Sequence, residues 1–297
     1  MGPTASGKTG LGIQLAQALN GEIISVDSAL VYKGMDIGTA KPSREEQQGI
    51  PHHLLDIIEP TQSYSAGEFC SQAKQLIDDI DKRGKTPILV GGTMLYFHSL
   101  LEGMAILPEA DEAVRKEIDR QAQKLGWLVM HQQLAKIDPK AAARIHPNDP
   151  QRIQRALEVY QISGKTQTEW VDQQKDIELP FQPLKYAIAP RERSTLHEKI
   201  ALRFDLMLKA GFMDEMEGLY HRGDLTPAMP SMRSVGYRQA WMYLDGEYNA
   251  EQMRERSIIA TRQLAKRQFT WLRKQQNLQW LETEDKLVFK KIMESIV

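Results

Sequence analysis

The chain has 297 residues, of which 41% are hydrophobic and 26% are charged, and its formal net charge is −1. These values are ordinary for a soluble globular protein with one large or two modest domains. The low net charge excludes a protein that is basic throughout, so any nucleic-acid site must be a local patch. No apolar run has the length of a membrane span and no signal peptide is recognisable, so we expect a cytoplasmic protein without membrane contact.

The chain opens on a phosphate-binding loop. Gly2-Pro3-Thr4-Ala5-Ser6-Gly7-Lys8-Thr9 fits the pattern G-x-x-x-x-G-K-[ST]. In such a loop backbone amides surround phosphate oxygens, Lys8 adds a positive charge, and Thr9 offers a hydroxyl to Mg²⁺. Apolar periodicity predicts a helix over 8–19, whose positive end faces the same anion. No strand precedes the loop in this sequence: either the start is mis-assigned, or the sequence is truncated, or the protein does without that strand. Without it we expect unpaired sheet hydrogen bonds and a poorly anchored loop.

Strands and helices alternate over the first hundred residues. Residues 22–26 and 86–90 have the apolar character of buried parallel strands. A helix capped by Ser65 is expected to run to about residue 83, and another begins after Gly91-Gly92-Thr93. The alternation predicts an α/β fold, with a doubly wound parallel sheet like that of the P-loop NTPases. Residues 31–60, rich in Gly, Pro and His, are expected to form a functional loop.

The pattern changes near Pro108. Residues 109–172 carry helical periodicity without a convincing strand, and Asn148-Asp149-Pro150 has the composition of a helix start. Beyond it we expect a strand at 184–189, a helix capped by Ser194, a long helix over 250–274 and a strand at 278–281. The predicted organisation is a first part of the catalytic core at 1–108, a helical insertion at 109–180 and a second core part at 181–297.

The acidic residue of the site comes early in the chain. Many phosphate-loop ATPases end a buried strand with an acidic residue that holds Mg²⁺, but the strand at 86–90 leads into Gly-Gly-Thr instead. Asp27 follows the strand at 22–26. Because the carboxyl ends of parallel strands meet at one edge, Asp27 and Thr93 should face the same crevice as Lys8. The alternatives are a turn or capping role for Asp27 and a helix N-cap for Thr93.

Basic residues gather in three places. The stretch 254–274 has seven basic residues against the single acid Glu255, with aromatic residues interleaved. Arg152 and Arg155 form a second cluster, and Arg233 and Arg238 a third. A solvated helix face is the simpler explanation for the long stretch. Three basic clusters in a net-acidic chain favour one shared polyanionic partner.

Together these residues resemble the tRNA dimethylallyltransferases, also called tRNA isopentenyltransferases, and most closely the bacterial members. The resemblance covers nearly the whole chain. Besides the phosphate loop it rests on Val-Asp-Ser-Ala at 26–29, Met-Asp-Ile-Gly-Thr-Ala-Lys-Pro at 35–42, Pro-His-His-Leu-Leu-Asp at 51–56, Val-Gly-Gly-Thr-Met-Leu-Tyr at 90–96, Ile-His-Pro-Asn-Asp-Pro-Gln-Arg at 145–152, Ser-Val-Gly-Tyr-Arg-Gln at 234–239 and Thr-Arg-Gln-Leu-Ala-Lys-Arg-Gln at 261–268.

The family transfers a dimethylallyl group from its diphosphate to the exocyclic amine of the adenosine 3′ of the anticodon, in tRNAs that read codons beginning with U. The resemblance implies that residues 2–9 bind the diphosphate rather than ATP, that Asp27 is the general base, and that Thr93 helps to hold the diphosphate. Lys8 and Thr93 are expected to be catalytic together with Asp27. Mg²⁺ is the expected cofactor, near Thr9. Arg233 is expected to add a fork of donors to the diphosphate.

The resemblance also implies contacts with the anticodon stem-loop of tRNA. In the first core part they are Asp27, Ser28, Ala29 and Leu30, where Leu30 replaces a Gln of many relatives. In the insertion, which would serve tRNA binding, they are Arg115, Gln151, Arg152, Ile153, Gln154 and Arg155. In the second core part they are Arg233, Ser234, Val235, Gly236, Tyr237, Arg238, Lys266, Arg267, Gln268, Phe269, Thr270, Trp271, Leu272 and Arg273.

Two other functions are considered. A small-molecule kinase with a helical lid also needs a phosphate loop, but it does not explain three basic clusters. A non-catalytic tRNA-binding protein would not need Lys8, Thr9, Asp27 and Thr93. We therefore expect a monomeric enzyme whose partners are tRNA and dimethylallyl diphosphate.

Overall fold

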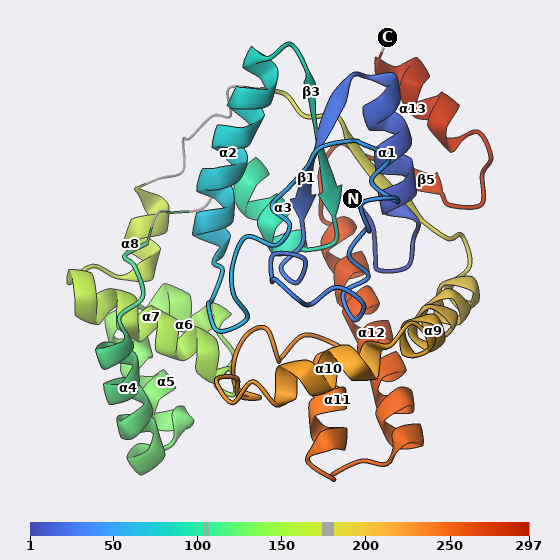
Figure 1. The fold of residues 1–297 in the computed structure, drawn as a ribbon. Helices are drawn as coiled ribbons and strands as arrows, with labels where there is room; N and C mark the ends of the chain where they lie inside the picture. The colour runs from blue at the N-terminus through green and yellow to red at the C-terminus, as the bar shows by residue number, and fades with distance from the viewer. Residues whose placement is uncertain (104, 106, 174–180, 297) are drawn as a thin grey trace. The chain divides into compact units, whose positions relative to one another are not determined.

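The structure, a computed structural model, describes residues 1–103, 105, 107–173 and 181–296 (Figure 1). The chain divides into two compact units, Met1–Leu100 with Gln182–Val297, and Leu101–Phe181. All of the strands described belong to the first unit, and the predicted insertion at 109–180 falls within the second. The protein therefore has an α/β fold in which one unit is helical.

Two small parallel sheets lie in the first unit. β1 (Gly21–Val26), β2 (His52–His53) and β3 (Thr86–Gly91) form a sheet of order β2-β1-β3, and β4 (Lys185–Ala189) pairs with β5 (Leu278–Glu282). Gly21 lies opposite Thr86 and Val26 opposite Gly91, so β1 and β3 end level with each other. The four strands expected from the sequence are confirmed. β2 was not predicted, because it is only two residues long and lies in the segment expected to be a loop.

Helices cover the strands of the first unit. Figure 1 draws β1 and β3 between α1 (Lys8–Ala18) and α2 (Ala66–Lys82). The other helices are α3 (Met94–Leu101), which runs into the second unit, α9 (Arg193–Lys209), α10 (Phe212–Tyr220), α11 (Tyr237–Leu244), α12 (Ala250–Leu272) and α13 (Val288–Ile296). No helix in the described part of the chain is long and apolar enough to cross a membrane.

The sequence predicts helix caps at Ser65 and Ser194 in the first unit, and one of the two is confirmed. Ser65 caps α2 in a capping box with Glu68, as expected. The predicted cap at Ser194 is wrong. α9 already includes Ser194, since it begins at Arg193, and the preceding Glu192 makes no side-chain capping hydrogen bond. The apolar face of α9, which includes Leu196, fixes the helix without a polar cap.

The second unit contains α4 (Glu112–Leu125), α5 (Trp127–Ile137), α6 (Pro139–Arg144), α7 (Pro150–Ser163) and α8 (Gln167–Asp172). Its described residues form no strand, as predicted. The helix start at Asn148-Asp149-Pro150 is confirmed: the Asp149 side chain accepts a hydrogen bond from the Arg152 N–H, and Pro150 occupies the first turn of α7. Ile153, on the inner face of α7, is fully buried in the core of this unit.

A buried carboxylate ties down the beginning of β1. Glu22 is 3% exposed and pairs with His53, Arg83 and Lys85 at 2.7, 2.7 and 2.9 Å. Burial alone raises the pKa of Glu22, but hydrogen bonds from Lys85, His53 and Arg83 outweigh it and lower this pKa to about 2. An ionised group thus holds the amino end of β1, which is the end opposite to Asp27.

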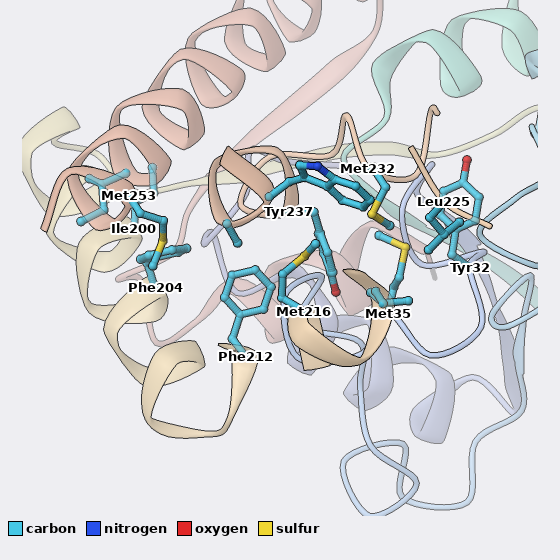
Figure 2. Packing of buried hydrophobic residues seen from close by; sticks show 14 of the residues in the cluster. Tyr32, Met35, Ile200, Phe204, Phe212, Met216, Leu225, Met232, Tyr237 and Met253 are labelled. Atoms are coloured by element: carbon cyan, nitrogen blue, oxygen red, sulfur yellow. The ribbon is translucent and has the colours of Figure 1, made fainter. Parts of the chain in front are cut away.

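The segment after β1 is packed onto the helices of the C-terminal half. Figure 2 shows Met35 and Tyr237 in one apolar cluster, with Tyr237 close to Met216. Glu215 of α10 accepts hydrogen bonds from the N–H groups of residues 36, 37 and 38, at 2.8, 2.7 and 3.1 Å, and from the Tyr237 hydroxyl. The motif at 35–42 is therefore held rigidly, and this fixes the chain that leads away from Asp27.

Candidate active site

The phosphate loop is a tight turn that leads directly into α1. Gly7 has φ of 80°, a left-handed conformation that favours glycine, and precedes the first residue of α1. The Ser6 side chain is fully buried, and its hydroxyl has no hydrogen-bond partner among the described residues. A buried hydroxyl without a partner, beside a helix N-terminus, suits an oxygen of a bound phosphate.

Several contacts anchor this loop to the second sheet. The Met1 nitrogen donates to the Tyr186 carbonyl at 2.8 Å, and the Ile188 N–H donates to the Met1 carbonyl at 3.0 Å. The Thr283 hydroxyl, just beyond β5, donates to the Ser6 carbonyl at 3.1 Å. The expectation of a poorly anchored loop is therefore wrong for this structure, because β4 and the residue after β5 hold it.

Three charged groups meet at the loop. The Lys8 ammonium donates to the Pro3 carbonyl at 2.7 Å and lies within electrostatic reach of Asp27 and Arg203. Burial and the charge of Arg203 lower the pKa of Lys8 to about 8, although Asp27 acts in the opposite direction. Burial also lowers the pKa of Arg203, and Asp27 raises it in part. Two half-buried cations beside one carboxylate give this place a net positive charge, which suits an anion.

Asp27 and Thr93 lie where β1 and β3 end. The Asp27 carboxylate accepts a hydrogen bond from the Ala29 N–H at 2.9 Å, which fixes the turn after β1. The Thr93 N–H donates to the Val26 carbonyl at 3.1 Å, and the Thr93 hydroxyl accepts from the Ser28 N–H at 3.0 Å. The structure thus brings Lys8, Asp27 and Thr93 together. The Thr93 hydroxyl therefore points toward Ser28. The Thr93 carbonyl accepts hydrogen bonds from the N–H groups of residues 96 and 97, in the first turn of α3.

The residues expected to contact tRNA in the first unit differ in exposure. Gly236, Tyr237, Gln268 and Leu272 are buried, so they do not offer a side chain to a surface contact. Asp27, Ala29, Leu30, Ser234, Val235, Phe269 and Trp271 are partly buried. The exposed members are Ser28, Arg233, Arg238, Lys266, Arg267, Thr270 and Arg273. A role in tRNA contact stays a prediction, best founded for this last group.

Arg233 does not reach the loop in this structure. Its side chain is exposed, and within the described residues neither a hydrogen bond nor an ion pair joins it to the loop. The arginine beside Lys8 and Asp27 is Arg203, from α9, whose guanidinium donates to the Thr39 carbonyl at 3.1 Å. The expected contribution of Arg233 to diphosphate binding therefore stays a prediction.

In the second unit, a buried acid organises two of the expected tRNA contacts. Glu158 is fully buried and accepts hydrogen bonds from Arg115 at 2.9 and 3.2 Å and from Arg155 at 2.7 Å. Gln154 bonds to Asp119. Gln151 and Arg152 are exposed at the start of α7. Ile153 is a core residue, so its side chain is not available to RNA. Because two arginines share the single carboxylate of Glu158, these three side chains together carry a net positive charge.

Comparison with known proteins decides the family. Residues 30–275 match the model of the family described as IPP transferase. The chain belongs to the IPP transferase family. It is 57% identical over 283 residues to the tRNA dimethylallyltransferase of Methylococcus capsulatus (strain Bath), which covers 95% of this chain and 91% of that protein.

Solved structures of IPP transferase relatives share the fold. The full-length tRNA isopentenylpyrophosphate transferase of Bacillus halodurans is 40% identical, with a TM-score of 0.71 over 99% of this chain and 92% of that one. The Staphylococcus epidermidis enzyme is 38% identical, with a TM-score of 0.72 over 100% and 96%. A eukaryotic dimethylallyltransferase captured acting on tRNA is 31% identical, with a TM-score of 0.81 over 99% and 76%.

Sequence reasoning missed Arg203 in this member of the IPP transferase family. It lies between the buried positions Ile200 and Phe204 of α9, so a cation on the inner side of an amphipathic helix was the only available signal. Its neighbours Lys8 and Asp27 are far away in the sequence. Only the packing of α9 brings it to the site.

Proposed function

We propose that this protein transfers a dimethylallyl group from dimethylallyl diphosphate to the exocyclic amine of the adenosine 3′ of the anticodon, in tRNAs that read codons beginning with U. The observation that carries the proposal is the meeting of Lys8, Arg203 and Asp27 at the phosphate loop of an IPP transferase chain. Two cations suit a leaving diphosphate, and one carboxylate suits the proton of the amine.

The donor would bind at residues 2–9, in a core that we propose to be doubly wound like that of the P-loop NTPases. Breaking the allylic carbon–oxygen bond spreads positive charge over the dimethylallyl group and leaves the diphosphate negative. Loop amides, the Ser6 hydroxyl, Lys8 and Arg203 are in place before the reaction, so little reorganisation is needed as this charge develops. Arg233 would have to move toward the loop to join them.

Thr9 is the residue that would hold Mg²⁺. Its side chain is exposed at the first turn of α1, next to the loop. The described residues contain no group of three His, Cys, Asp or Glu side chains that could hold a metal by themselves. This fits a magnesium ion bound mainly by substrate phosphates and water with one protein oxygen, an arrangement common for Mg²⁺. When bound, Mg²⁺ supplies positive charge to the diphosphate oxygens.

Asp27 would act on the acceptor. The adenine amine is a weak nucleophile because the ring shares its lone pair, and its proton becomes acidic only as the carbon–nitrogen bond forms. A carboxylate beside the site can accept that proton late in the reaction. The carbon–oxygen bond breaks, the carbon–nitrogen bond forms, the proton passes to Asp27, and the diphosphate leaves. Thr93 would keep the turn after β1 in place through Ser28.

The acceptor base must leave its stack to reach such a site. Flipping a base costs a few kcal/mol and is easiest in a loop, which fits an anticodon loop as substrate. We propose that the exposed cations of α12 bind the RNA backbone, among them Lys266, Arg267 and Arg273, and that Arg152 of α7 does the same. Tyr237, Leu272 and Ile153 are buried, so they would support RNA binding only by packing in the core.

The experiment that tests this function offers the purified protein both possible donors. Unmodified tRNA is incubated with dimethylallyl diphosphate or with ATP, and the products are followed by chromatography. We expect prenylated tRNA with the first donor and no phosphorylated product with the second. Phosphorylation from ATP without prenylation would support the small-molecule kinase and contradict the proposal. A chain that binds tRNA but modifies nothing would support the non-catalytic alternative.

A further inference from the structure

Gln268 is a buried polar residue on a helix whose neighbouring side chains face solvent. It lies in α12 and is 7% exposed, whereas Lys266 and Arg267 beside it are exposed. The buried residues Ala265 and Leu272 mark the inner face of this helix, and Gln268 belongs to that face. A buried amide must find partners for both of its ends, because an unpaired one costs about 1–3 kcal/mol.

Both partners of this amide belong to the candidate site. The Gln268 Oε1 accepts a hydrogen bond from the Thr4 N–H at 2.8 Å, and its Nε2 donates to the Gly92 carbonyl at 2.8 Å. Thr4 N–H can only donate and Gly92 C=O can only accept, so the amide has a single orientation. One side chain thus joins the phosphate loop to the turn that carries Thr93.

The close approach of this amide to Gly92 has a consequence for the residue at that position. A Cβ atom at Gly92 would lie 2.6 Å from the Gln268 Nε2, closer than carbon and nitrogen can approach. A glycine is therefore required there as long as the amide occupies its place. The next residue, Thr93, is bonded to Val26 and Ser28 on either side of Asp27.

We infer that Gln268 is a positioning residue that sets the phosphate loop in register with Asp27 and Thr93, and that it does not contact tRNA. This deepens the proposed function, on which it rests. α12 then has two faces: its exposed cations are directed to RNA, and its buried amide holds the diphosphate loop. Breaking the bridge lets the loop shift against Asp27, which misaligns the leaving group with the attacking amine.

The test compares Gln268→Met, which keeps the length of the side chain but neither hydrogen bond, with Gln263→Met, a matched change at an exposed position of the same helix. For Gln268→Met we expect kcat to fall at least about tenfold, since small misplacements of reacting groups are costly. The KM for dimethylallyl diphosphate and the Kd for inorganic diphosphate with magnesium should rise, and the Kd for tRNA should stay within about twofold of wild type. Gln263→Met should behave as wild type.

Gly92→Ala provides a second route to the same bridge. Its added methyl should displace the amide and lower kcat, and adding it to Gln268→Met should cost less than in the wild-type background, since both changes break one interaction. If Gln268→Met instead weakens tRNA binding alone, Gln268 is a tRNA contact and the inference is wrong. It is also wrong if only the melting temperature changes while kcat and both KM values stay unchanged. A wild-type protein that transfers nothing would refute the proposed function instead.

Discussion

Asp27 is the residue on which the proposed chemistry depends most. Its carboxylate follows β1, is fixed by the Ala29 N–H, and lies within electrostatic reach of Lys8. We predict that Asp27→Ala abolishes dimethylallyl transfer, because its carboxylate is the proposed acceptor of the amine proton, while tRNA affinity stays within a few-fold. Single-turnover transfer and filter binding measure the two effects separately. A large loss of binding with residual transfer would make Asp27 a residue that positions the RNA.

The pKa of Lys8 leads to a prediction about how diphosphate binding depends on pH. Its pKa is lowered to about 8 in the unliganded protein, chiefly by burial, and a bound diphosphate must raise it, because negative charge favours the protonated ammonium. The affinity for diphosphate should therefore be steady below about pH 8 and fall as the pH rises beyond it, with proton uptake on binding there. Calorimetry in buffers of different ionisation enthalpy measures both quantities. An affinity that stays constant up to about pH 10, close to the ordinary pKa of a lysine, would contradict this assignment.

The same two residues show what a sequence can predict about a site. Lys8 and Asp27 follow from a motif and from the place where a strand ends, and both conclusions depend on neighbours in the chain. Arg203 could not be predicted, because it reaches the loop only when α9 packs in the folded unit. The resemblance places Gln268 among the expected tRNA contacts, with the cations around it. One position along a helix turns a side chain by about a hundred degrees, so a basic run always includes residues of the opposite face.

At the scale of elements, α12 and α7 should carry the electrostatic part of tRNA binding. We predict that Lys266→Ala and Arg152→Ala each weaken tRNA binding and reduce the slope of log K against log salt concentration by about 1. The matched control is Lys290→Ala, an exposed lysine of α13. Filter binding at several salt concentrations checks this. An unchanged slope for both variants, or an equal change for the control, would remove these helices from the RNA interface.

β1 depends on the ion pairs of Glu22, near its beginning. Glu22 has its pKa lowered to about 2 in the folded protein from an ordinary value of 4.5, so it stabilises the fold fully above the ordinary pKa and loses this effect as the pH falls toward 2. We predict that Glu22→Gln lowers the free energy of unfolding by about 1–3 kcal/mol at neutral pH. The difference from wild type should shrink below pH 4.5, as denaturant titrations can show. A difference that is independent of pH would mean that packing, not charge, is at work.

Elements with a strong local signal were predictable, and others were not. Buried strands such as β1 and β3 are continuous apolar runs, and the starts of α2 and α7 are marked by Ser65 and by Asp149-Pro150. β2 is a strand only because it pairs with β1, which no local pattern reveals. α9 begins before its expected cap because its apolar face is packed, so tertiary contacts decided its boundary.

For the whole molecule, the sequence led to the right family through the order of its motifs. The α/β character and the helical insertion followed from periodicity. The chain passes from one compact unit to the other between Leu100 and Leu101, the last two residues of α3, whereas its composition changes near Pro108. A continuous helix gives no local sign of such a division, because the division depends on which distant residues pack together. The predicted domain bounds follow the change in composition, and they stay a prediction.

The central claim is that this protein adds a dimethylallyl group to the adenosine 3′ of the anticodon. The most direct measurement is mass spectrometry of tRNA from cells that lack the protein, complemented with the wild type or with Asp27→Ala. We predict that the isopentenyl mark is lost from tRNAs reading codons that begin with U, that the wild type restores it, and that Asp27→Ala does not. Persistence of the mark in the deletion strain, or its full restoration by Asp27→Ala, would contradict the account.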